Sequence, residues 1–128
     1  MLRSPAPRPR RAPAAASLLA VVAPDTTYSI LALTGELDLS TAPLLARLVE
    51  QQIATGHLDV RVDLSELAFC DVRGMRALLA GRRRLAAVGG ELTLLHARPV
   101  LLRTASLAGF AAELGLSGEL APARAPSA

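Results

Sequence analysis

The chain has 128 residues, of which 52% are hydrophobic and only 2% aromatic, so it is long enough to form one domain around an aliphatic core. No apolar run reaches the roughly 20 residues that a membrane-spanning helix needs, which argues against membrane insertion. Residues 17–120 contain nine Arg against eleven carboxylates, so the formal net charge of +3 comes from the chain ends and predicts no basic face for nucleic acid.

Composition divides the chain into three predicted segments. Residues 1–16 are rich in Pro, Arg and Ala, which is typical of a disordered tail, and residues 119–128 are predicted to be a flexible tail. Residues 17–118 carry the periodic apolar patterns of one folded domain. The single cysteine, Cys70, excludes an intramolecular disulfide or a cysteine metal cluster, which fits a reducing cytoplasm.

The first half of the domain predicts two strands and a helix. Residues 18–23 and 28–34 read as strands joined by a turn, and residues 36–39 follow as a separate short extended piece. Ser40 or Thr41 is expected to cap the next helix, Pro43 lies in its first turn, and Gly56 ends it. The predicted buried stripe of this helix is Leu45, Leu48, Val49 and Ile53.

The centre of the sequence is a strand that leads through a loop into a second helix. Residues 60–64 alternate as a strand, and Ser65-Glu66 is expected to connect it to a buried apolar loop over residues 67–70. Asp71 is then expected to cap a helix that ends at Gly89-Gly90, because its carboxylate can accept from free N–H groups of the first turn. The predicted buried positions of this helix are Met75, Leu78, Leu79 and Leu85.

The last part of the domain predicts one more strand, over residues 91–97, and a helix that begins at Pro99. Residues 109–116 are read as either a short strand or a turn. The candidate apolar side of the last helix is Val100, Leu101, Ala105, Leu107 and Ala108. The alternation of strands and helices predicts a small α/β domain with a mixed, mainly parallel sheet of four or five strands and helices mostly on one face.

No catalytic or metal-binding constellation is recognisable in the sequence. His57 and His96 are not spaced for pairing with a nucleophile, and both glycine patterns that cradle phosphates are absent. Cys70 lies among apolar residues, where burial raises a thiol pKa and makes it unreactive. We therefore predict that the protein is not an enzyme and has no catalytic residues, metal site or cofactor.

Four segments together resemble a STAS domain, and more narrowly the anti-sigma factor antagonists. They are L-T-G-E-L-D-L-S-T-A-P (33–43), V-D-L-S-E-L-A-F-C-D-V-R-G-M-R-A-L (62–78), G-G-E-L-T-L (89–94) and R-P-V-L-L-R-T-A-S-L-A-G-F (98–110). The resemblance implies a protein-binding regulator that docks on an anti-sigma factor or a related kinase-like protein. In that family the kinase phosphorylates the Ser that follows the helix-opening Asp, which ends the interaction.

The sequence departs from this family at the phosphorylated residue. Asp-Ser-Ser-Gly is replaced by Asp71-Val72-Arg73-Gly74, so Val72 holds the phosphoacceptor position and cannot be phosphorylated. Arg73 could redirect binding toward an acidic surface, or simply pair with Asp71 or Glu66. The residues expected to bind the partner are Asp38, Ser40, Thr41, Asp71, Val72, Arg73, Gly74 and Arg76. The resemblance is also compatible with a homodimer. The alternative function is that of the small STAS subunit of a lipid-transport ATPase complex.

Overall fold

The computed structural model describes residues 18–24 and 28–116. The predicted tails, 1–16 and 119–128, and the predicted domain boundaries at residues 17 and 118 lie outside these ranges. The strands are β1 (Leu18–Pro24), β2 (Ser29–Leu37), β3 (Asp59–Cys70) and β4 (Glu91–Leu95), and the helices are α1 (Ala42–Ala54), α2 (Val72–Ala87) and α3 (Pro99–Ala108).

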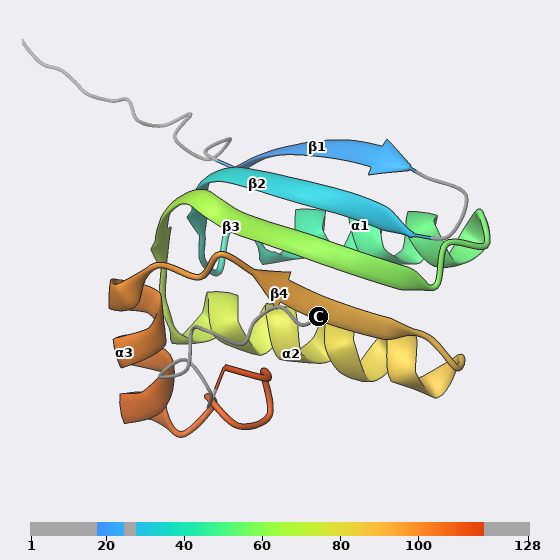
Figure 1. Ribbon diagram of the computed structural model, residues 1–128. Coiled ribbons are helices and arrows are strands. Elements are labelled where there is room, and N and C mark those ends of the chain that lie inside the picture. The colour runs from blue at the N-terminus through green and yellow to red at the C-terminus, as the bar shows by residue number, and fades with distance from the viewer. Residues whose placement is uncertain (1–17, 25–27, 117–128) are drawn as a thin grey trace, which may run out of the picture.

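The strands form one sheet in the order β1-β2-β3-β4. β1 is antiparallel to β2, whereas β2, β3 and β4 are parallel to one another. Figure 1 shows α1 and α2 running side by side along the sheet, and α3 near the end where β3 leads into α2. The predicted α/β class with a mixed, mainly parallel sheet is confirmed.

Alternating apolar residues of the parallel strands turn toward α1 and α2 and form the core. Leu31 and Leu33 of β2 and Val60 and Val62 of β3 are fully buried, whereas their neighbours along each strand are only partly covered. The predicted buried stripes of α1 and α2 are confirmed, with Leu48 and Ile53 at the partly buried edge of the core. The fully or almost fully buried helix positions are Leu45, Val49, Met75, Leu78, Leu79 and Leu85.

β3 is longer than the sequence predicts, because Ser65-Glu66 does not interrupt it. β2 also continues, from Thr34 to Leu37, so it supplies a pairing partner for the second half of β3. Two irregularities in the pairing of β2 with β3 disturb the alternation of side chains. Phe69 is consequently 52% exposed, and the expectation of a buried apolar loop over residues 67–70 is wrong.

α3 buries only part of the predicted apolar side. Leu101 and Ala105 are buried, but Val100, Leu107 and Ala108 are exposed. Residues 109–116 form turns rather than a strand, and Leu114 and Leu116 supply the missing apolar cover.

Within the described residues, none of the helices has the length and apolar character required to cross a bilayer.

Candidate functional site

The predicted site residues gather at the edge of the sheet where β2 and β3 end. Leu37 and Cys70, the last residues of these two strands, are paired, and the Asp71 N–H donates to the Leu37 carbonyl oxygen at 3.3 Å. The loop over residues 38–41 therefore lies beside the start of α2. We call residues 38–41 together with residues 71–74 the β2/β3 corner.

Asp71 caps α2 as predicted. Its Oδ1 accepts from the Gly74 N–H at 2.8 Å, and its carbonyl oxygen accepts from the Met75 N–H at 2.9 Å. Gly74 is buried against β2, and a β-carbon there would overlap the Leu37 carbonyl oxygen and lie 2.9 Å from the Cys70 Sγ. Gly74 therefore brings the helix close to the sheet, and its burial does not favour the predicted direct contact with a partner.

Asp38 organises the other loop of the corner. Its Oδ1 accepts from the Ser40 N–H at 3.0 Å, the Ser40 hydroxyl at 2.8 Å and the Thr41 N–H at 3.2 Å. The Thr41 hydroxyl accepts from the Asp38 N–H at 2.9 Å and lies 2.9 Å from the Glu36 carbonyl oxygen, to which it donates. Neither Ser40 nor Thr41 makes the predicted side-chain cap to α1, because both hydroxyls are used inside the loop.

The hydrogen bonds in this loop stabilise the ionised form of Asp38. The Ser40 hydroxyl is the largest single cause of a lowered Asp38 pKa, and the bonds from Thr41 and from the Ser40 N–H add to it. Partial burial opposes the shift but does not reverse it. The corner thus presents two carboxylates, Asp38 and Asp71, that are both engaged in holding their own loops.

The exposed side chains of the corner are those of Leu39 (63%), Val72 (39%), Ser40 and Arg73. Arg76, which follows the corner in α2, is exposed as well. Among the described residues, no carboxylate lies within 4.0 Å of Arg73, so the interpretation that it pairs with Asp71 or Glu66 is wrong. Arg73 is available to a partner.

An apolar groove of about 500 Å³ continues from the corner between α1 and α2. Leu39 of the corner lines it at one end, and the ion pair of Arg84 with Glu50 lines it farther along both helices. Its other lining residues are small or aliphatic: Ala42, Pro43, Ala46, Val49, Ala77, Ala80 and Gly81. Sequence analysis missed this groove, and its sequence sign is that most of the residues that α1 and α2 place along it are alanine or glycine.

A sequence model of the family described as "Mlab, STAS domain" matches residues 21–121, which is most of the chain. The chain belongs to the STAS family. The resemblance stated from the four sequence segments is therefore confirmed at the level of the domain.

Solved structures share this STAS fold. An anti-sigma factor antagonist from Mycobacterium paratuberculosis matches with a TM-score of 0.65 and 24% identity, over 75% of this chain and 81% of that one. The anti-sigma factor antagonist SpoIIAA in its unphosphorylated form matches with a TM-score of 0.62 and 22% identity, over 72% and 82%. The Bacillus cell fate determinant SpoIIAA in its phosphorylated form matches with a TM-score of 0.59 and 23% identity, over 73% and 86%. At these identities the likeness shows the fold.

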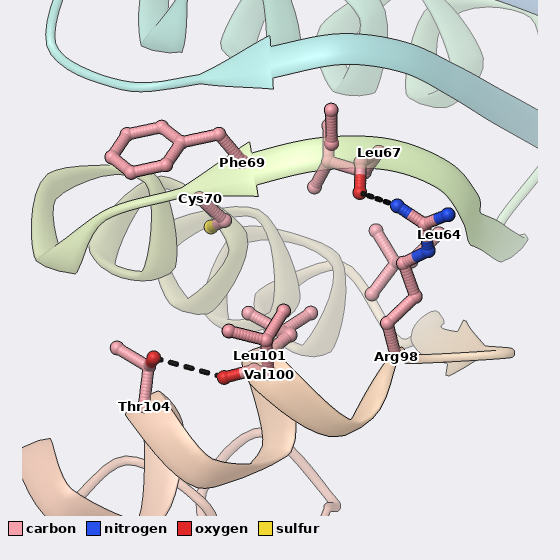
Figure 2. A pocket seen from close by; sticks show the side chains of 9 residues that line it. Leu64, Leu67, Phe69, Cys70, Arg98, Val100, Leu101 and Thr104 are labelled. Atoms are coloured by element: carbon pink, nitrogen blue, oxygen red, sulfur yellow. Dashed lines mark hydrogen bonds between the residues drawn. The ribbon is translucent and has the colours of Figure 1, made fainter.

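This STAS domain also has a smaller cavity, of about 90 Å³, between the end of β3 and α3 (Figure 2). Phe69 and Cys70 come from β3, and Arg98 and Val100 from the start of α3. Burial raises the pKa of the Cys70 thiol to about 12, and the neighbouring Asp71 adds to the shift, so the thiol is protonated at neutral pH. The cavity was not predicted, because it depends on how α3 packs against β3.

The two histidines lie away from the corner. His96 Nδ1 is 3.2 Å from Asp63 Oδ1, which joins the end of β4 to β3. Burial alone would raise the Asp63 pKa, but hydrogen bonds from Ser65 and His96 outweigh it and lower the value. His57 is 3.0 Å from the Thr55 hydroxyl in the turn after α1. No group of three or more potential metal ligands occurs among the residues that the structure describes.

Proposed function

We propose that this STAS domain is a protein-binding regulator of the anti-sigma factor antagonist type. It docks on an anti-sigma factor with a kinase-like ATPase fold through the β2/β3 corner, and it performs no catalysis. Asp38, Ser40, Thr41 and Asp71 shape the docking surface, and Val72, Arg73 and Arg76 contact the partner.

The observation that carries the proposal is the position of Val72 and Arg73 in the first turn of α2. Both side chains are exposed beside the loop over residues 38–41, and Arg73 has no carboxylate partner among the described residues. The adjoining groove adds apolar area on the same side, with Leu39 at its rim. Exposed apolar surface next to an unpaired cation is a common composition of protein-binding sites.

The absence of a hydroxyl at residue 72 makes this docking independent of phosphorylation at that residue. A phosphate next to Asp71 would add up to two negative charges beside an existing carboxylate and would oppose binding of an acidic partner surface. Val72 cannot accept a phosphate, so the proposed complex lacks the off switch that the family places there.

Titration calorimetry against the ATPase-fold anti-sigma factors of the same cell tests the docking surface. We expect Arg73→Glu to weaken binding more than tenfold, equivalent to about 1.4 kcal/mol. Arg103→Glu is the matched control, because Arg103 is an exposed α3 residue with no carboxylate within 4.0 Å in the described part of the chain. Equal affinities for the wild type and Arg73→Glu would place the interface elsewhere.

Mass spectrometry of the intact protein after incubation with the kinase and ATP tests whether phosphorylation is absent. The wild-type protein is expected to gain no phosphoryl group, whereas Val72→Ser is expected to gain one. A phosphoryl group on Ser40, Thr41 or Ser65 of the wild-type protein would reveal a switch at another residue and contradict phosphorylation-independent docking.

The rival function is that of a small STAS subunit in a lipid-transport ATPase complex. It is favoured by the same observation, Val72 in place of a hydroxyl, because a constant subunit needs no phosphoswitch. Copurification from cells separates the two functions. A transporter ATPase with its permease would support the rival, and an anti-sigma factor would support the first proposal.

A further inference from the structure

The second half of β3 has a strand neighbour on one side only, within the described residues. β4 pairs with β3 from Asp59 to Asp63, and β4 ends at Leu95. His96 then turns the chain away with a φ of 58°, a left-handed conformation that few residues other than glycine adopt. The pairing of β3 with β2, by contrast, continues to Cys70. Residues 64–70 are therefore an edge of the sheet on the side that faces α3.

The space beside this edge is the cavity of about 90 Å³ that Figure 2 shows. Arg98 reaches across it and donates from Nη1 to the Leu67 carbonyl oxygen at 3.4 Å. The Leu67 carbonyl oxygen therefore faces this space, and because a carbonyl oxygen has two lone pairs it can accept a second hydrogen bond from an added strand.

The side chains around the edge indicate the chemistry of what binds there. Phe69 is 52% exposed and Val100 is 55% exposed, and both line the cavity, whose floor includes the buried side chains of Leu64, Leu67 and Leu101. Arg98 makes one long hydrogen bond to a carbonyl, and no carboxylate lies within 4.0 Å of it among the described residues. An apolar cavity with an unpaired cation at its rim is complementary to an aliphatic side chain next to a carboxylate.

We propose that the β3 edge, residues 64–70, binds an extended segment of a partner protein that carries an aliphatic residue and, close to it, an acidic one. The segment adds to β3 beyond the end of β4, its aliphatic side chain enters the cavity, and its carboxylate pairs with Arg98. Addition of a strand to an exposed sheet edge is a general mode of peptide recognition, in which main-chain bonds give affinity and side-chain pockets give specificity. This surface faces α3, whereas the β2/β3 corner faces α1 and α2.

The test uses the full chain, labelled with ¹⁵N, and end-capped peptides of the form Thr-X-Thr-X-Thr-Asp, where X is Ala, Val or Leu and, because side chains alternate along a strand, Asp lies on the same face as X. The Val or Leu peptide is expected to shift the amide resonances of residues 64–70 and 98–104, and more strongly than the Ala peptide does. The same peptide with N-methylated X residues lacks the N–H groups needed to pair along the strand and is expected not to bind. Absence of shifts at these residues with all three peptides, or shifts centred on the β2/β3 corner, would overturn the proposal.

The role of Arg98 has its own readout. Replacing Asp of the peptide by Asn is expected to weaken binding about threefold, the size of effect typical for a partly exposed ion pair. Arg98→Gln should abolish this difference, whereas Arg103→Gln, on the same helix, should keep it. Val100→Glu is a second variant, which leaves the fold intact because Val100 is exposed. It should weaken binding of the Asp peptide, because the two carboxylates repel each other. Equal binding of the Asp and Asn peptides to the wild-type protein would contradict the proposed carboxylate contact.

Discussion

Gly74 lies so close to the carbonyl oxygen of Leu37 that a β-carbon at residue 74 would overlap this oxygen. The obstacle is backbone rather than a flexible side chain, so the start of α2 would have to move away from the end of β2. We expect Gly74→Ala to lower the free energy of unfolding by about 1–3 kcal/mol, as overpacking does in other cores. Urea denaturation measures the loss.

Gly81→Ala is the control for this prediction, since it is the same substitution in the same helix. The nearest atoms to the new β-carbon are side-chain methyls of Leu92 and Val49 at 3.3 Å, which can shift slightly. In a helix interior, alanine is also more favourable than glycine by about 1 kcal/mol. A loss for Gly81→Ala as large as that for Gly74→Ala would show that the contact with Leu37 is not the cause.

Removal of the carboxylate of Asp71 should destabilise α2. Asp71→Ala leaves the buried Gly74 N–H without its acceptor and should cost about 1 kcal/mol, whereas Asp71→Ser keeps an oxygen that can cap and should cost less. Thermal unfolding of both variants checks the order. Equal losses would mean that the cap contributes nothing measurable.

Acid should weaken the loop over residues 38–41 through Asp38. Its pKa in the folded protein is below the usual value, so the unfolded chain binds the proton first, and stability is lost as the pH falls through the folded pKa. Ser40→Ala removes the largest cause of the shift and should raise the Asp38 pKa. Carboxyl ¹³C titration by NMR measures it, with the exposed Ser106→Ala as control. An unchanged value would contradict the role of the Ser40 hydroxyl.

The Cys70 thiol should be inert in the folded protein. Because burial raises its pKa to about 12, it carries almost no thiolate at neutral pH and should react with a disulfide reagent only after unfolding in urea. The folded state also keeps this proton above the pKa of an unfolded thiol, about 8.5, so stability should fall as the pH rises beyond that value. Rapid modification of the native protein would show an open path to the thiol.

The sequence was sufficient for those features that depend on neighbours along the chain. The alternation in β2 and β3, and the carboxylate of Asp71 three residues before Gly74, are local patterns, and the structure confirms both. The lack of a carboxylate partner for Arg73 among the described residues could not be predicted, because it depends on which carboxylates the fold brings near.

The errors concern features that depend on pairing between distant segments. Ser65-Glu66 looks like a break in a strand, but the longer β2 beside it keeps the strand intact. Val100 and Leu107 were wrongly assigned to the buried side of α3 because they satisfy the helical spacing, whereas the buried surface is set by the approach of the turns over residues 109–116. The groove between α1 and α2 and the cavity between β3 and α3 correspond to no local sequence pattern.

The pairing of Leu18 with Gly35 has a practical consequence for labelling experiments. It makes β1 begin at the same margin of the sheet as the β2/β3 corner, so a tag or fluorophore fused ahead of Leu18 is tethered next to the surface under study. The turns at Gly56 and Gly89 occupy the opposite margin, but both glycines have a φ of 83°, which other residues rarely adopt. Dyes for distance or anisotropy measurements therefore belong just before those turns, on the exposed Ala54 and Ala87, where they leave association undisturbed.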